Sequence, residues 1–148
     1  MVEPEHYIIK GKGKLIKLSS EKILTVEDII KIHDVMIEIG NRDENLDDPK
    51  ILTLPVVLED LVNKLQYKEV SFLTKTAYIV YQLAYQHPFV QGNKRSAMLC
   101  SYIYLIKNDY KIPDEKIDEF TDIILQTAKY EIGVEQIKKW LKKNVIKV

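Results

Sequence analysis

Two strongly apolar segments near the middle of the chain constrain its fold more than any other feature. Residues 72–87 have the periodicity of an apolar helix, and residues 96–108 are apolar nearly all round a second helix. A helix that is apolar on all sides must be surrounded by other elements. The sequence therefore predicts a bundle of helices with residues 96–108 at its centre.

The flanking sequence predicts further helices, at residues 25–39, 56–65, 113–130 and 134–144. Thr25 and Asp28 resemble a capping box at the start of the first, and Pro55 suits the start of the second. Gly133 separates the last two helices from each other.

The N-terminal part is different in character. Residues 7–18 contain two short β-favouring runs around Gly11-Lys12-Gly13, which indicates a small hairpin or an extended arm. Residues 40–50 are polar and rich in turn-forming residues, which predicts a long loop. We therefore expect an all-α helical bundle with a small N-terminal β-hairpin or an extended arm. Residues 1–23 would form the arm or hairpin, and residues 24–148 a single helical domain.

Composition limits the function. The chain of 148 residues has 22 basic and 22 acidic residues and so no net charge, and nothing in this balance favours direct nucleic-acid binding or an acidic membrane. No apolar run approaches the roughly 20 residues of a membrane span, which favours a cytoplasmic protein with no membrane partner. Cys100 is predicted to be buried in a helix. His6 and His33 lack partners at metal-ligand spacing and are predicted to be structural.

The loop between the two apolar helices contains several residues of types that bind ligands or take part in catalysis. Its sequence, from His87 to Arg95, is His-Pro-Phe-Val-Gln-Gly-Asn-Lys-Arg. It combines a titratable imidazole, a glycine turn, a capping amide at Asn93 and two cations at the N-terminus of a helix, where backbone N–H groups favour anions. Pro88 should end the preceding helix and hold His87 at its end. These residues predict a phosphate-binding loop.

This loop resembles the signature of the Fic/Doc family, which runs His-x-Phe-x-Asp/Glu/Asn-Gly/Ala-Asn. Gly-Arg follows in the adenylyl-transferring Fic branch, and Lys-Arg follows in the Doc, or death-on-curing toxin, branch. The order of the elements from Leu24 to Val145 is also similar. Two flanking strings resemble the family too: the helix that carries His33-Asp34, and residues 40–44, which are similar to the segment leading into the target-docking flap.

The resemblance implies a small helical bundle and a role for each motif residue. His87 would be the catalytic general base that takes the proton from a target hydroxyl, a role to which an imidazole is suited. Phe89 would anchor the loop. Gly92 would permit the tight turn and the close approach of the backbone to the phosphates of ATP. Asn93 would orient the loop and help to bind these phosphates, and Lys94 with Arg95 would supply charge to them.

Lys94 favours the Doc branch, as does Met98, which stands where Fic proteins have a second arginine. The resemblance then implies a toxin of a toxin-antitoxin system that transfers the γ-phosphate of ATP to a threonine of translation elongation factor Tu. A good match to the inhibitory Ser/Thr-x-x-x-Glu-Gly/Asn helix is missing, so we expect inhibition by a separate Phd-like antitoxin.

Gln91 departs from the family pattern, in which Asp or Glu holds Mg²⁺. An amide oxygen can still ligate Mg²⁺, but it lacks the charge that this cation prefers. Two alternatives therefore stay open beside the Doc-type kinase. One is a Fic-type transferase of AMP, and the other is a catalytically silent relative that binds nucleotide or antitoxin.

Overall fold

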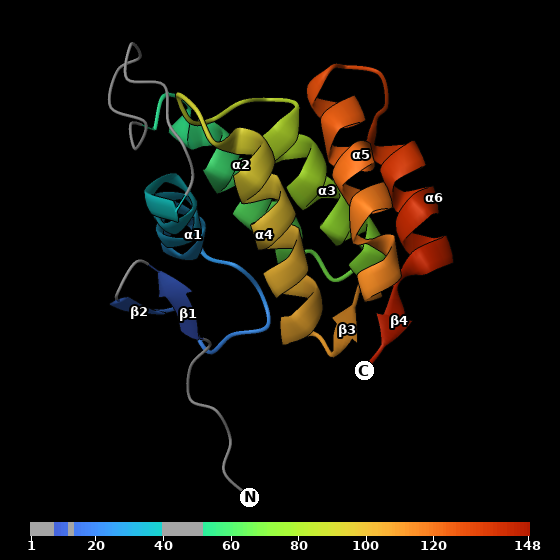
Figure 1. Cartoon of the computed structure of the whole chain (residues 1–148), viewed down its shortest axis with the longest axis horizontal. Coiled ribbons are helices and arrows are strands. Elements are labelled where there is room, and N and C mark those ends of the chain that lie inside the picture. Colours follow the sequence, from blue (N-terminus) through green and yellow to red (C-terminus); the bar gives the residue numbers. More distant parts are fainter. Residues whose placement is uncertain (1–7, 12–13, 40–51) are drawn as a thin grey trace, which may run out of the picture.

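The computed structural model describes residues 8–11, 14–39 and 52–148. Within these ranges helices dominate, and they form one bundle (Figure 1). The helices are α1 (Val26–Ile39), α2 (Pro55–Leu65), α3 (Phe72–Ala84), α4 (Asn93–Lys107), α5 (Ile117–Ala128) and α6 (Val134–Asn144). Helix α4 packs chiefly against α3 and also against α1 and α5. The prediction of an all-α bundle is confirmed.

Short strands lie beside the helices. Strands β1 (Ile8–Gly11) and β2 (Lys14–Lys17) pair antiparallel, which confirms the predicted hairpin. Strands β3 (Tyr110–Lys111) and β4 (Ile146–Lys147) form a second antiparallel pair that the sequence did not predict, because two residues are too few for a periodicity to appear. The division of the chain at residue 23 stays a prediction.

The starts of the helices follow local sequence signals. At α1, the backbone N–H of Asp28 donates to Thr25 Oγ1 over 3.0 Å and the N–H of Thr25 donates to Asp28 Oδ2 over 3.1 Å, so the predicted capping box is confirmed. Helix α2 begins at Pro55, also as predicted. A 3₁₀ turn, η1 (Asp114–Lys116), precedes α5, which therefore begins later than Pro113 had indicated.

The core lies where α3 and α4 meet the other helices. Leu83, Ala97 and Leu105 are fully buried there. Cys100 is fully buried as predicted, and this burial, together with the nearby charge of Asp28, raises the pKa of its thiol far above the usual value. Burial of each large aliphatic side chain stabilises the fold by about 1.5 to 3 kcal/mol.

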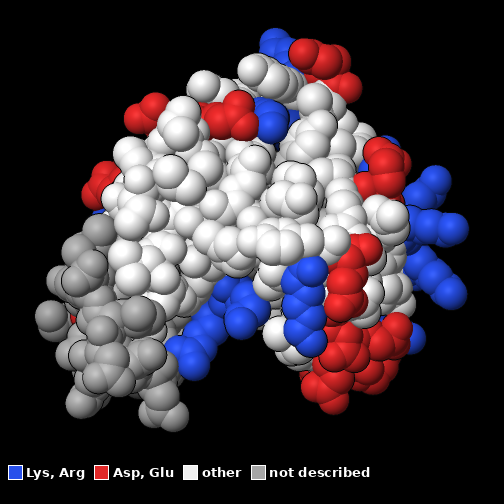
Figure 2. All heavy atoms as spheres, turned by 90° about the horizontal axis from the view of Figure 1, so that it is seen from above, with Lys and Arg blue, Asp and Glu red and all other residues white. Residues whose placement is uncertain are grey.

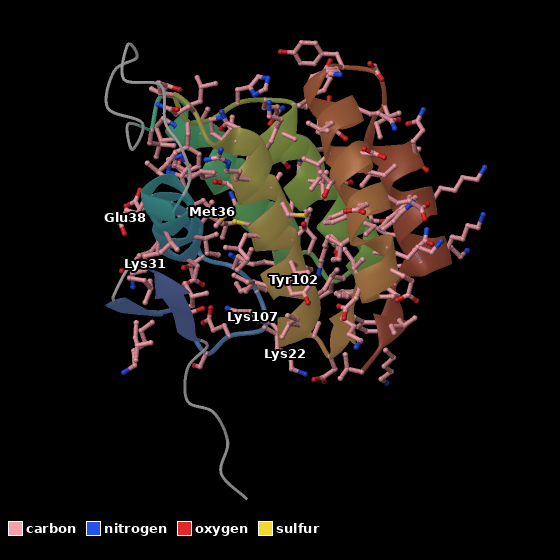
Figure 3. The ribbon with its side chains drawn as sticks, in the orientation of Figure 1. Lys22, Lys31, Met36, Glu38, Tyr102 and Lys107 are labelled. Atoms are coloured by element: carbon pink, nitrogen blue, oxygen red, sulfur yellow. The ribbon has the colours of Figure 1, made fainter. Side chains whose placement is uncertain are left out.

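A buried ion pair anchors the lower end of α4, where Lys107 lies (Figure 3). Lys107 is 1% exposed, and its Nζ lies 3.6 Å from Asp28 Oδ2 at the start of α1. The same ammonium donates to the carbonyl oxygens of Ser19 and Ile23, over 3.1 and 2.9 Å. These bonds tie the segment that follows β2 to the centre of the bundle.

The same network shifts both pKa values. Burial works to raise the pKa of Asp28, but hydrogen bonds from Ser19 and Thr25 and the charge of Lys107 outweigh it and hold this pKa below its usual value. Burial lowers the pKa of Lys107, against the opposing charge of Asp28. The sequence did not predict this pair, because its members are far apart along the chain.

Candidate active site at the upper end of the bundle

The loop that joins α3 to α4 lies at the upper end of the bundle (Figure 1). Helix α3 ends at Ala84, so the predicted extension of this helix to His87 is wrong by three residues. His87 instead has a φ of 48°, in the left-handed region that residues other than glycine rarely adopt. Pro88 accounts for the difference, since a residue that precedes proline is disfavoured in the right-handed helical conformation.

The side chain of Asn93 holds this loop closed. Its Oδ1 accepts a hydrogen bond from the backbone N–H of Phe89 over 3.0 Å, and its Nδ2 donates to the carbonyl oxygen of Phe89 over 2.9 Å. The prediction that Asn93 caps α4 is therefore wrong. Gly92 takes the cap position, and its carbonyl oxygen accepts from the N–H of Ser96 over 2.9 Å. Asn93 is the first helical residue, and its amide binds the loop behind it.

His33 from α1 supports the loop from below. Its ring is fully buried and stacks on Phe89, with ring centroids 3.6 Å apart and an angle of 6° between the planes. His33 Nε2 lies 2.7 Å from the carbonyl oxygen of Gln91. A carbonyl can only accept, so Nε2 carries the proton. His33 is thus structural as predicted, and the structure places it in contact with the motif loop. The sequence signal for this contact was the His33-Asp34 pair.

Gly92 is required at its position on two grounds. Its φ of 80° is left-handed, and a Cβ atom there would lie 2.7 Å from Ile37 Cδ1 and 3.2 Å from His33 Nε2. Glycine alone combines this backbone conformation with the close approach of α1.

Two cations follow the loop directly. Lys94 and Arg95 are exposed in the first turn of α4, which contains no acidic residue. They line a cavity of about 280 Å³ together with apolar side chains of three helices. Its other lining residues are Met36, Met98, Thr121, Ile124 and Leu125. Figure 2 views the molecule from above, and it shows Lys and Arg side chains gathered in a hollow of this face. The positive end of the α4 dipole adds to their charge.

An uncharged groove of about 520 Å³ adjoins His87. Its lining residues are Leu54, Val56, Val57, Tyr85, Gln86 and Tyr130. The segment before α2 is fixed to the loop, because the carbonyl oxygen of Pro88 accepts from the backbone N–H groups of Thr53 and Leu54, over 2.9 and 3.0 Å. Tyr130 connects this groove with the imidazole, since its ring lies edge-on to that of His87.

A model of the Fic/DOC family matches residues 23–105, which is more than half of the chain. The matched range includes the loop with His87, the turn at Gly92 and the cations that follow. The chain belongs to the Fic/DOC family. Members of this family are typically transferases, and the match is common to its Fic and Doc branches. A search of curated proteins found no match.

The family match covers the motif residues of this chain, but it does not test what each of them does. Those predicted for His87, Gly92, Asn93, Lys94 and Arg95 stay predictions. The predicted loop at residues 40–50, including the segment similar to the flap, lies outside the described residues, as does His6. No helix in the described ranges is long and apolar enough to cross a membrane.

The residues do not build a magnesium site on their own. Position 91 has an amide in place of the Fic/DOC carboxylate, and its backbone carbonyl is already engaged with His33. Among the described residues, no three His, Cys, Asp or Glu side chains are grouped so that they could hold a metal ion. We therefore assign no chemical step to Mg²⁺, and the prediction of Gln91 as a metal ligand stays a prediction.

Proposed function

We propose that this Fic/DOC protein is a Doc-type phosphotransferase, which moves the γ-phosphate of ATP to a hydroxyl of a protein target such as a translation elongation factor. The observation that carries the proposal is the pair of exposed cations, Lys94 and Arg95, in the first turn of α4 directly after the loop that holds His87. Such a turn offers positive charge and backbone N–H groups to phosphate oxygens.

Met98 supports phosphoryl over nucleotidyl transfer. Its side chain lines the same cavity as Lys94 and Arg95, at the position where an adenylyl-transferring Fic protein would have its second arginine. With methionine there, the cavity floor is apolar and has one cation fewer for a bound triphosphate. This favours the Doc-like chemistry.

The chemistry divides between the loop and the helix. A ring nitrogen of His87 takes the proton from the target hydroxyl as its oxygen bonds to the γ-phosphorus of ATP, and the bond from that phosphorus to the bridging oxygen breaks, releasing ADP. Lys94 and Arg95 stabilise the charge on the phosphate oxygens.

A Phd-like antitoxin is the partner that we propose for control. The support is the sequence itself, because the 148 residues contain no good match to the inhibitory Ser/Thr-x-x-x-Glu-Gly/Asn helix, which favours restraint by another chain. Expression of the protein alone should arrest growth, and the genetic neighbour should relieve the arrest. Free growth on expression, with no such neighbour, would contradict this partner.

Gln91 favours a second candidate, a catalytically silent protein that binds nucleotide or antitoxin. The neutral amide weakens the hold on Mg²⁺ that the family carboxylate provides. A silent protein would bind ATP through Lys94 and Arg95 but transfer nothing.

The test measures transfer from γ-labelled and from α-labelled ATP, with Mg²⁺, to purified elongation factor and to a cell lysate. Wild type, His87→Ala and Gln91→Asp are compared. We expect γ-label on the target in wild type, its loss in His87→Ala by a factor of about 10² to 10⁴, and ATP affinity in His87→Ala close to that of wild type.

The remaining outcomes separate the alternatives. Transfer of the α-label would mean AMP transfer. Transfer by Gln91→Asp alone would mean that the missing carboxylate silences the protein, and nucleotide binding without transfer by any variant would favour the binding role.

A further inference from the structure

Left-handed backbone conformations point to an unassigned residue at the site. Three described residues other than glycine have positive φ: His87 at 48°, Asp109 at 66° and Tyr130 at 65°. Two of these three touch each other, because the rings of His87 and Tyr130 lie 6.0 Å apart at an angle of 73°. Strained residues other than glycine are concentrated at functional sites, and Tyr130 has no role in the activity described above.

Tyr130 occupies a position that favours glycine. The backbone N–H of Tyr130 donates to the carbonyl oxygen of Thr127 over 3.1 Å, and that of Glu131 donates to Gln126 over 2.9 Å. These two bonds are those of a Schellman motif, in which the left-handed residue after the helix is usually glycine. A tyrosine there is strained, and since its side chain is 61% exposed, burial offers little compensation.

The ring of Tyr130 is held in place by α3. It lies edge-on to Tyr85, with centroids 4.7 Å apart, and Tyr85 stacks on Tyr81 at 4.6 Å. Both distances are typical of favourable aromatic pairs. Tyr85, directly after the last residue of α3, thus braces Tyr130 from one side, and Tyr130 contacts His87 on the other.

The two histidines of the site are held in different ways. The ring of His33 is fixed by its stack on Phe89 and by its hydrogen bond to Gln91. Within the described ranges, no hydrogen bond reaches either ring nitrogen of His87, and Tyr130 is its only ring contact. A general base must keep a nitrogen open for the proton that it accepts. An edge contact orients the imidazole and leaves its nitrogens available.

We propose that Tyr130 is a positioning residue, whose ring holds the imidazole of His87 at the edge of the uncharged groove. This inference rests on the proposed function, in which His87 is the base. The ring, and not the hydroxyl, does the positioning.

The test compares Tyr130→Gly, Tyr130→Phe and the matched control Asp109→Gly, which relieves the same left-handed conformation at the opposite end of the bundle. In Tyr130→Gly we expect kcat to fall about tenfold, since small displacements of a catalytic group cost that much or more. The KM for ATP should stay unchanged, and the melting temperature should not fall. Tyr130→Phe and Asp109→Gly should keep the wild-type kcat. Wild-type kcat in Tyr130→Gly, or an equal loss in Tyr130→Phe, would overturn the inference.

A second measurement does not depend on activity. The NMR signals of the His87 imidazole carry the ring-current shift of a nearby aromatic ring. They should move toward the values of a free histidine in Tyr130→Gly and stay unchanged in Asp109→Gly. This movement in a protein that transfers no phosphate would count against the proposed function while supporting the positioning contact. Unchanged signals in Tyr130→Gly would overturn the contact itself.

Discussion

Helix α4 has a lysine near each end, and the two ends use positive charge in opposite ways. At the lower end Lys107 is fully buried and bonded to Asp28, Ser19 and Ile23 (Figure 3). At the upper end Lys94 is exposed beside a cavity. The lower lysine stabilises the fold, and the upper one is available to a ligand. Location on one helix therefore says little about the role of a charge, whereas burial and partners decide it.

The backbone differs between the two ends as well. The lower end combines regular pairing of β3 with β4 and a network of hydrogen bonds around Lys107. The upper end gathers His87, Gly92 and Tyr130, all left-handed. Such strain persists only where surrounding contacts enforce it, and here Asn93 and His33 do so. The buried ion pair thus lies at the lower end, and three of the four left-handed residues of the described ranges lie at the upper end, with Asp109 as the exception below.

The largest effect on stability should come from breaking the lower network. In Asp28→Ala the ammonium of Lys107 stays buried without its carboxylate, and removal of one partner of a buried pair costs about 3 kcal/mol or more. Chemical denaturation measures the loss. The matched control is Glu27→Ala, the neighbouring residue on α1, whose exposed pair with Lys31 spans 3.2 Å and should matter by about 0.5 kcal/mol or less. Equal losses in both variants would contradict the comparison.

Acid provides an independent check on the same pair. The pKa of Asp28 is lower in the fold than in the unfolded chain. As pH falls, the carboxylate of Asp28 therefore binds a proton in the unfolded chain before it does so in the folded one. The stability that Asp28 contributes is present above its unfolded pKa and is lost as pH falls through its folded pKa. This acid dependence should be smaller in Asp28→Asn than in wild type, as measured by unfolding at a series of acid pH values.

The next effect should come from the upper turn. Gly92→Ala forces an L-residue to a φ of 80° and brings its Cβ within 2.7 Å of Ile37 Cδ1, which should destabilise the protein by about 2 kcal/mol. Thermal unfolding measures this. Gly133→Ala is the control, because its Cβ would meet only Gln136 Oε1, at 3.7 Å. A Gly92→Ala variant as stable as Gly133→Ala would show that the loop yields easily.

The smallest effect on stability should come from Lys94→Ala. The side chain is exposed, so the free energy of unfolding should change by about 0.5 kcal/mol or less. Its affinity for ATP, measured by calorimetry, should nevertheless fall about tenfold, because a charge-assisted hydrogen bond is lost. Unchanged ATP affinity would remove the contrast with Lys107.

Much of the fold follows from local patterns, and much of the site does not. Periodicity predicted the helices, and Thr25 with Asp28 and Pro55 marked two of their starts. The loop was found because its chemistry is contiguous in sequence. By contrast, the pairing of Lys107 with Asp28 and the contact of Tyr130 with His87 join distant segments. The cap predicted at Asn93 was wrong because an amide suits a helix cap and a loop clamp equally well, and only the tertiary path of the chain decides between them.

The burial of Cys100 has a practical consequence for following the approach of the proposed protein target. A thiol whose pKa is raised by full burial forms little thiolate and reacts slowly with electrophilic dyes. A cysteine introduced at Val56, which is exposed at the groove, would therefore be labelled selectively without removal of the native thiol. A fluorophore attached there would report the arrival of a partner beside His87 in real time.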